Sequence, residues 1–234
     1  MRDWDAILAT VAELPLSGWR AVLAEFCGSG EWRQPLEALL HQEEQLDRIA
    51  GTSFFHPTGG YKLILASGGY DGPEIRLHVW PTGSKVERDH NLHTAHNHKW
   101  SFASYVLHGA FVERIFIEAP EGAEPNYDRY CYDSPVRGKQ YESRLVGPRR
   151  LEEAFCTPMT AGTAYSQSSH LLHTFVPADT GLAATLFVRT RYLPVSHTDV
   201  YVPRGQQAVL DQPSGPARLQ KSDVIELIAL TLGA

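Results

Sequence analysis

The spacing of apolar residues divides the chain into a helical beginning, a long central region of strands and a helical end. Apolar side chains recur every three to four positions in residues 2–14, 17–26 and 31–49, which predicts three helices. Pro15 and the glycines after the second and third stretches end these patterns. A last helix is expected at 222–232. The apolar stripes of the first helices need a partner surface, either the protein's own sheet or a second subunit.

From residue 53 onward the apolar residues alternate with polar ones, which is typical of strands. Turn clusters rich in glycine and proline separate these short stretches, and no apolar pattern between residues 53 and 192 predicts a long helix. The expected strands are residues 61–67, 74–80, 109–117, 127–132, 140–146, 151–156, 163–167, 171–176 and 184–191. Many short strands at regular spacing predict a sandwich or barrel.

The chain therefore has three expected parts. They are an N-terminal helical segment (1–52), a barrel (53–195) and a tail with a terminal helix (196–234). The tail is polar and contains proline and glycine, so no strand is predicted before its helix.

The composition is that of an ordinary globular protein, 43% hydrophobic and 21% charged. A net charge of −6 gives no electrostatic reason to expect nucleic acid or an anionic membrane as partner. No apolar run approaches the roughly 18–20 residues that cross a bilayer, and no secretory signal is visible. Cys27, Cys131 and Cys156 form no CxxC pair, which indicates a reducing compartment. We expect a cytoplasmic protein that binds neither nucleic acid nor membrane.

Two histidines two positions apart give the first chemical signal. His96 and His98 would point to the same face of a strand, and two imidazoles converging on one point can bind a metal ion. Gly109, eleven residues after His98, suits a tight reversal between strands. A metal pair of this kind needs a third protein ligand from elsewhere in the chain.

A second histidine cluster offers that third ligand. His173 lies in a strand-like run, whereas His170 lies nearer a serine-rich turn. The residues alone leave both open. If His173 is the ligand, His170 is expected to lie beside the site or in the loop, and if His170 is the ligand, His173 is expected to point into the core.

The first histidine motif resembles that of the cupin superfamily. In that pattern HxH is followed by three or four residues, a glutamate, six residues and a glycine. Here His96-Asn97-His98 is followed by three residues, then by Phe102 in place of the glutamate, then by six residues and Gly109. The spacing is kept and the acid is missing.

The second motif resembles cupins only loosely through Pro158 to Gly162, and it is closer to the variant of cysteine-dioxygenase-like cupins. His173-Thr-Phe-Val fits the position of their third histidine. The resemblance covers roughly residues 60–192. It implies a mainly β fold, the cupin double-stranded β-helix or jelly-roll barrel, with helices before and after it. It also implies Fe(II) bound by His96, His98 and His173.

The residue types alone do not separate Fe(II) from zinc, manganese or nickel. The resemblance favours iron. Phe102 excludes the cysteine–tyrosine crosslink of cysteine-dioxygenase relatives, and cysteine itself is not predicted as the substrate.

Strand parity suggests which residues surround such a centre. Trp100 and Phe102 continue the face of the histidine pair, and Arg76 and His78 share one face of their strand with Trp80. Arg189 is a candidate for binding a substrate carboxylate. These residues, other than Trp80, form the predicted substrate-binding set.

Tyr165 and His170 are the predicted catalytic residues. Tyr165 lies eight residues before His173 and is suited to donate a hydrogen bond to bound substrate or oxygen. His170 is the second histidine of the same cluster.

The expected function is that of a non-haem Fe(II) oxygenase, which takes O₂ and a small metabolite that chelates the metal. The alternatives are a metal cupin with isomerase, lyase or hydrolase chemistry, and a cupin that binds a small molecule without turnover. A homodimer is possible, because cupins often pair through sheet edges.

Overall fold

The structure is a computed structural model of the chain. It describes residues 3–55, 60–69, 71–83, 94–120, 122–133, 142–178, 181–191, 193, 197–206 and 218–234. Three histidines that are not predicted metal ligands, His56, His90 and His93, lie outside the described residues.

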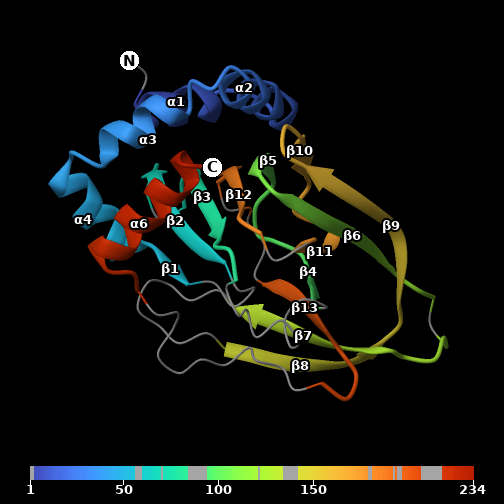
Figure 1. Cartoon of the computed structure of the whole chain (residues 1–234). Helices are drawn as coiled ribbons and strands as arrows, with labels where there is room; N and C mark the ends of the chain where they lie inside the picture. The colour runs from blue at the N-terminus through green and yellow to red at the C-terminus, as the bar shows by residue number, and fades with distance from the viewer. Residues whose placement is uncertain are drawn as a thin grey trace.

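Two antiparallel sheets enclose the centre of the molecule (Figure 1). One sheet, here called the helix-covered sheet, has the strand order β1 (Phe54–Phe55), β2 (Tyr61–Ser67), β3 (Glu74–Trp80), β12 (Ala183–Arg189), β5 (Phe102–His108) and β10 (Ala164–Gln167). The other, the open sheet, has the order β8 (Glu142–Arg149), β7 (Tyr127–Asp133), β13 (Thr198–Pro203), β4 (Ala95–His96), β11 (Leu172–Pro177), β6 (Ala110–Glu118) and β9 (Leu151–Thr160). The expected mainly β jelly-roll barrel with helices at both ends is confirmed.

The chain passes from one sheet to the other at Gly109, between β5 and β6. Its φ of +74° lies in the left-handed region that favours glycine. A Cβ there would also come within 2.6 Å of the Leu182 carbonyl oxygen. The reversal predicted at this glycine therefore has two physical reasons.

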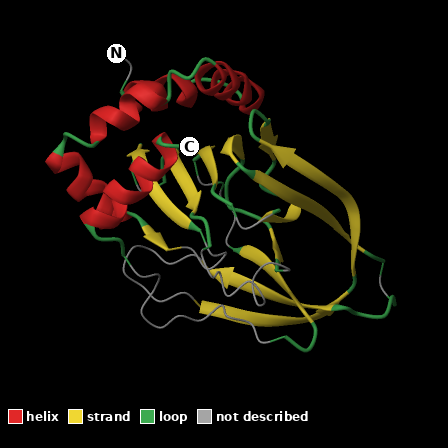
Figure 2. Ribbon diagram, viewed as in Figure 1, coloured by secondary structure: helices red, strands yellow, loops and turns green. Residues whose placement is uncertain are grey.

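Among the described residues, the helices pack on the outer face of the helix-covered sheet (Figure 2). They are α1 (Trp4–Ala12), α2 (Leu16–Gly28), α3 (Arg33–Leu39), α4 (Glu43–Thr52) and α6 (Lys221–Leu232). Their apolar stripes share one core with the outward-facing residues of β2, β3, β5 and β12. The partner surface of the helical segment is thus the protein's own sheet.

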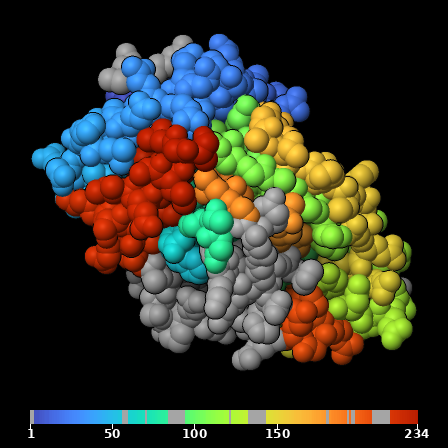
Figure 3. Space-filling view, in the orientation of Figure 1, coloured from blue at the N-terminus to red at the C-terminus, as the bar shows by residue number. Residues whose placement is uncertain are grey.

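The helix-covered sheet is consequently buried on both faces, and β12 is buried along its whole length. Leu186 and Val188 face the helices, whereas Thr185 and Phe187 face the inside of the barrel. The open sheet carries exposed apolar side chains on β9 and β6, among them Phe155 and Ile117. Figure 3 shows the helices on one side of the molecule and β6 and β9 on the other.

Three local predictions were wrong. The helix expected at 31–49 is two helices, because the chain turns at residues 40–42 so that α4 contacts both β2 and α6. The expected tail contains a strand, β13, which pairs with β7 and β4 inside the open sheet. The strand of the histidine pair ends at His96 and resumes only at Phe102.

Among the described residues, no helix combines the length and the apolar character needed to span a membrane.

Candidate metal centre

Backbone register brings the three predicted ligands together. His96 is on β4, and His173 is its direct partner on the antiparallel neighbour β11. Direct partners in an antiparallel pair point to the same face of the sheet, which here is the inside of the barrel. His98 follows two residues later, and its backbone N–H donates to the Ser169 carbonyl oxygen at 3.1 Å. The third histidine is therefore fixed beside the first two by sheet pairing.

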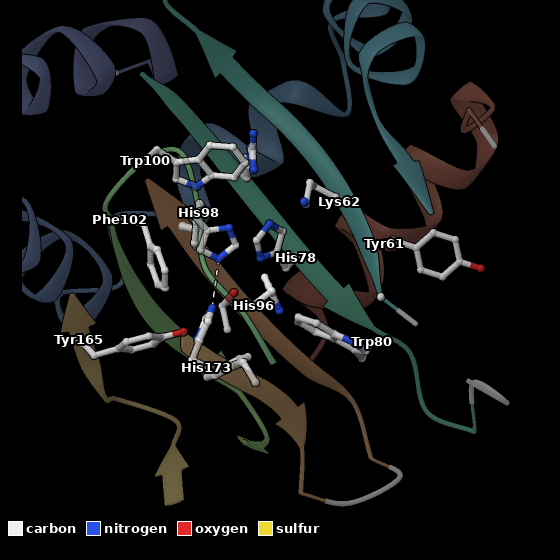
Figure 4. Close-up of a pocket in the computed structure, with 15 residues that line it drawn as sticks. Tyr61, Lys62, His78, Trp80, His96, His98, Trp100, Phe102, Tyr165 and His173 are labelled. Carbon is white, nitrogen blue, oxygen red and sulfur yellow. Dashed lines mark hydrogen bonds between the residues drawn. The ribbon is translucent and has the colours of Figure 1, made fainter. Parts of the chain in front are cut away.

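The distances fit a shared metal ion. The Nε2 atoms of His98 and His173 are 3.1 Å apart, and one nitrogen from each of the three histidines lies within 4.8 Å of the others. Two imidazoles at about 2.1 Å from one ion, at right angles, would place their nitrogens about 3.0 Å apart. The donor set therefore fits a divalent metal, and the residues that would hold it are His96, His98 and His173 (Figure 4).

Burial keeps the three imidazoles neutral, which is the form that binds metal. Desolvation lowers the pKa of His96 to about 3 and that of His173 to about 4. Burial, together with the neighbouring histidines, also holds the pKa of His98 well below its usual value. His96 Nδ1 lies 3.3 Å from the Thr94 carbonyl oxygen, so this nitrogen donates and leaves Nε2 free to bind a metal.

Glu113 lies behind His173. Its Oε1 is 3.5 Å from His173 Nδ1, neither atom forms a hydrogen bond with a described residue, and burial raises the pKa of this carboxyl group to about 7. A carboxylate on the far nitrogen of a metal-binding histidine fixes the ring and strengthens the ligand. The sequence analysis missed Glu113. The available signal was a charged residue on the buried face of β6, two positions after the buried Phe111.

A cavity of about 670 Å³, counting its opening to solvent, adjoins the three histidines. Its described lining contains no acidic side chain. The structure adds residues that were not in the predicted set. They are Gly60, Tyr61, Lys62, Trp80, Phe175, Thr185 and Phe187.

Most predicted neighbours line this cavity. Arg76, His78, Trp100, Phe102 and Tyr165 are all in its wall (Figure 4). The face of β3 that carries Arg76, His78 and Trp80 lines the barrel interior. Strand parity alone could not have told the interior from the side that faces the helices.

Phe102 makes the wall apolar where the cupin pattern has its acid. Its ring centroid lies 5.7 Å from that of His98 and 5.8 Å from that of His173. No carboxylate therefore approaches the histidines from this position. A bound metal would keep open positions for substrate.

Tyr165 is a protonated phenol in the cavity wall. Burial, the main cause, raises its pKa, and the neighbouring Ser104 hydroxyl partly opposes this rise. The ring stacks on Phe175 with centroids 5.6 Å apart. His170, by contrast, is exposed in the turn before β11 and is not among the residues lining the cavity. Its position does not support the predicted catalytic role.

The position of Arg189 does not support the predicted role of binding a substrate carboxylate. Its side chain is 1% exposed, and its Nη2 donates to Glu74 Oε1 at 2.6 Å. It is not among the residues lining the cavity. The same carboxylate accepts from Arg76 Nε at 2.7 Å. Arg189 therefore supports Arg76 through Glu74 and does not face a ligand.

No protein-family model and no curated protein match the sequence significantly. Among solved structures, a variant of oxalate decarboxylase from Bacillus subtilis matches at 15% identity and a TM-score of 0.32, over 57% of this chain and 26% of that chain. KdgF from Halomonas sp. matches at 15% identity and a TM-score of 0.30, over 57% of this chain and 82% of that chain.

Hydroquinone 1,2-dioxygenase from Sphingomonas sp. TTNP3, with 4-hydroxybenzoate bound, matches at 10% identity and a TM-score of 0.30, over 53% of this chain and 63% of that chain. These neighbours are cupin-type proteins, and the chain spans about a quarter of the length of the oxalate decarboxylase. Likeness at this level carries no conclusion about activity, so the chemistry rests on the chain's own residues.

Proposed function

We propose that the protein is a non-haem Fe(II) oxygenase that acts with O₂ on a small, metal-chelating metabolite. The observation that carries the proposal is the convergence of three neutral imidazoles on an aromatic-lined cavity without an acidic side chain in its described lining. Fe(II), when bound, would supply the electrons that O₂ needs to react with the substrate. Zinc, manganese and nickel are the alternative metals for this donor set.

The charge of the site favours an anionic substrate. Three neutral ligands leave the metal's charge of +2 uncompensated, and the described wall adds the guanidinium of Arg76 and the amino group of Lys62, which an anion would help to keep protonated. A substrate that chelates through a carboxylate or thiolate would balance this charge. Three protein ligands also leave coordination positions for substrate and O₂ together.

The chain's own groups would exclude water and orient the substrate. The rings of Trp80, Trp100 and Phe187 form much of the apolar wall, and closing a site to water strengthens the electrostatic contacts inside it. Tyr165 keeps its proton and is suited to donate a hydrogen bond to a substrate oxygen.

Metal binding is the first test of the proposal. Protein purified without chelators, and protein reconstituted anaerobically with Fe(II), should hold about one metal ion per chain by elemental analysis. His96→Ala and His173→Ala should hold none. His41→Ala, an exposed histidine remote in sequence from the site, and His170→Ala should keep it. Metal retained by His173→Ala but lost from His170→Ala would contradict the ligand set.

Oxygen use is the second test. The Fe(II) protein is screened with thiol carboxylates, catechols and 2-oxo acids in an oxygen electrode, with the Zn(II) protein as blank. Substrate-dependent O₂ uptake by the Fe(II) form alone supports the oxygenase. Turnover that continues without O₂, or with Zn(II), would favour the isomerase, lyase or hydrolase alternative.

A further inference from the structure

The helix-covered sheet carries more positive than negative charge in and directly behind the cavity wall. Lys62, Arg76 and Arg189 lie on adjoining strands of the helix-covered sheet, and Glu74 is the acid among them. Glu74 is shared by the two arginines, through 2.7 Å to Arg76 Nε and 2.6 Å to Arg189 Nη2. The group therefore keeps a positive excess after its internal ion pairs are formed.

Lys62 is the cation of this group that forms no ion pair with Glu74 among the described residues, although the Glu74 charge partly opposes the lowering of its pKa. It is the register partner of His78 on β3, lines the cavity, and points into it in Figure 4. In the part of the chain that the structure describes, no hydrogen bond or ion pair is formed by its ammonium, which lies 5.2 Å from the Phe54 ring centroid. Burial, and then the charge of Arg76, hold the pKa of Lys62 well below its usual value. Both causes indicate an ammonium group that an anion would stabilise.

Two further polar atoms in the same wall lack partners. His78 Nε2 and Trp80 Nε1 are buried and form no hydrogen bond with any described residue. Both side chains line the same cavity as Lys62, and His78 is its register partner. A buried polar group without a partner is costly, so such groups usually form a hydrogen bond with a ligand or water, and the Trp80 N–H can only donate. Charge and unsatisfied hydrogen-bonding groups therefore coincide at one place.

We infer that Lys62, with Arg76, binds a carboxylate at the end of the substrate remote from the metal. This inference rests on the proposed function, because it takes the three-histidine centre to bind the other end of the same molecule. The substrate class is then a compound with two anionic ends joined by an apolar body. Arg76 lies 5.5 Å from the Trp100 ring centroid and 5.8 Å from that of Phe187, so aromatic rings hold its guanidinium group in the cavity wall.

Matched ligand pairs test the inference directly. The Zn(II) protein is titrated with 2-oxopentanoate and 2-oxopentanedioate, and with the corresponding six-carbon pair, following quenching of tryptophan fluorescence. Each pair shares its chelating end and differs only in the second carboxylate. We expect the dicarboxylate to bind at least tenfold more tightly in at least one pair.

Substitution of the lysine should remove this preference. Lys62→Met should weaken dicarboxylate binding tenfold or more and change monocarboxylate binding less than twofold, whereas Lys62→Arg should keep most of the preference. Lys221→Met, which removes the same charge from α6, is the matched control. Equal affinities within both pairs in the wild type, or an equal loss for both ligands in Lys62→Met, would overturn the inference.

The metal centre is assessed separately in the same experiment. Metal content of Lys62→Met should equal that of the wild type. Monocarboxylate binding should disappear from metal-free wild-type protein if the three histidines form the chelating centre. A metal-dependent monocarboxylate signal without any dicarboxylate preference would thus reject the Lys62 site while leaving the metal centre intact.

Discussion

Glu113 occupies an inward-facing position on β6, where strand alternation alone predicts an apolar side chain. The Glu113 Oε1 atom lies 3.5 Å from His173 Nδ1. A buried carboxyl group with a raised pKa and one histidine neighbour is costly unless it serves that histidine. The candidate site is therefore three histidines that could hold a metal, plus one acid behind His173 that could orient its ring.

Replacing Glu113 should weaken metal binding without removing any metal ligand. We expect Glu113→Gln to reduce the affinity for Zn(II) by about 10–100-fold, because the amide no longer holds His173 with a full charge. Competition against a fluorescent chelator measures the change. Glu153→Gln, an exposed glutamate paired with Arg114 on the neighbouring strand, is the control. Identical Zn(II) affinities in all three proteins would contradict the assigned role.

Strand alternation explains which parts of the site the sequence could reveal. Parity put Arg76 and His78 on one face because alternation is a local property of the backbone. The partner of Arg189 was not visible, since Glu74 lies 115 positions away in the sequence and is brought near only by the pairing of β3 with β12. β13 was missed because its proline- and glycine-containing surroundings resemble a tail, and its stability comes from its neighbours in the open sheet.

The shared ion pair of β3 and β12 should make the protein sensitive to acid. Burial alone would raise the pKa of Glu74, but the guanidinium groups of Arg76 and Arg189 outweigh it and lower the pKa to about 2. An unfolded glutamate titrates near 4.3, so the folded state binds this proton more weakly than the unfolded state. The stabilisation is fully present above about pH 4.3 and is lost as the pH falls toward 2.

Urea unfolding between pH 3 and pH 7 measures this dependence. Glu74→Gln should cost about 3–5 kcal/mol at pH 7, because two buried guanidinium groups lose their acid. The cost should shrink as the pH falls. Glu152→Gln, at an exposed position of β9, should leave the curve unchanged. A cost for Glu74→Gln that is the same at pH 3 and pH 7 would show that its charge contributes no stability.

The whole molecule joins its helices and one sheet in a single apolar core, while the other sheet has no helix packed on it among the described residues. Helical periodicity predicted that the apolar stripes of the N-terminal helices pack on another surface. It could not identify which face of which sheet provides that surface. Exposed Phe155 and Leu145 lie on the open sheet, 68% and 56% accessible. The expected homodimer and the expected cytoplasmic location stay predictions.

The open sheet has a narrow connection at its centre. β4 contains two residues, and it pairs with β11 through the single pair His96–His173. The other side of β4 pairs with β13 through two residues. A metal bound by these histidines would tie the β8–β7–β13 group to the β11–β6–β9 group across this connection.

Bound metal should therefore stabilise the fold, in addition to its proposed role in catalysis. At a Zn(II) concentration a thousand times its dissociation constant, we expect about 4 kcal/mol of added stability, seen as a higher melting temperature than in chelator-treated protein. Amide hydrogen exchange in β4 and β11 should slow in parallel. The same shift in His96→Ala, or no shift in the wild type, would contradict this expectation.

The weak pairing of β4 has a consequence for protein made without its metal. If the connection opens, β11 and β13 each become an edge strand with unpaired backbone groups, and such edges pair readily with other chains. Metal supply during synthesis would then decide between soluble protein and aggregate. The stability of β4, the two-residue strand that carries His96, would then determine which of the two outcomes occurs.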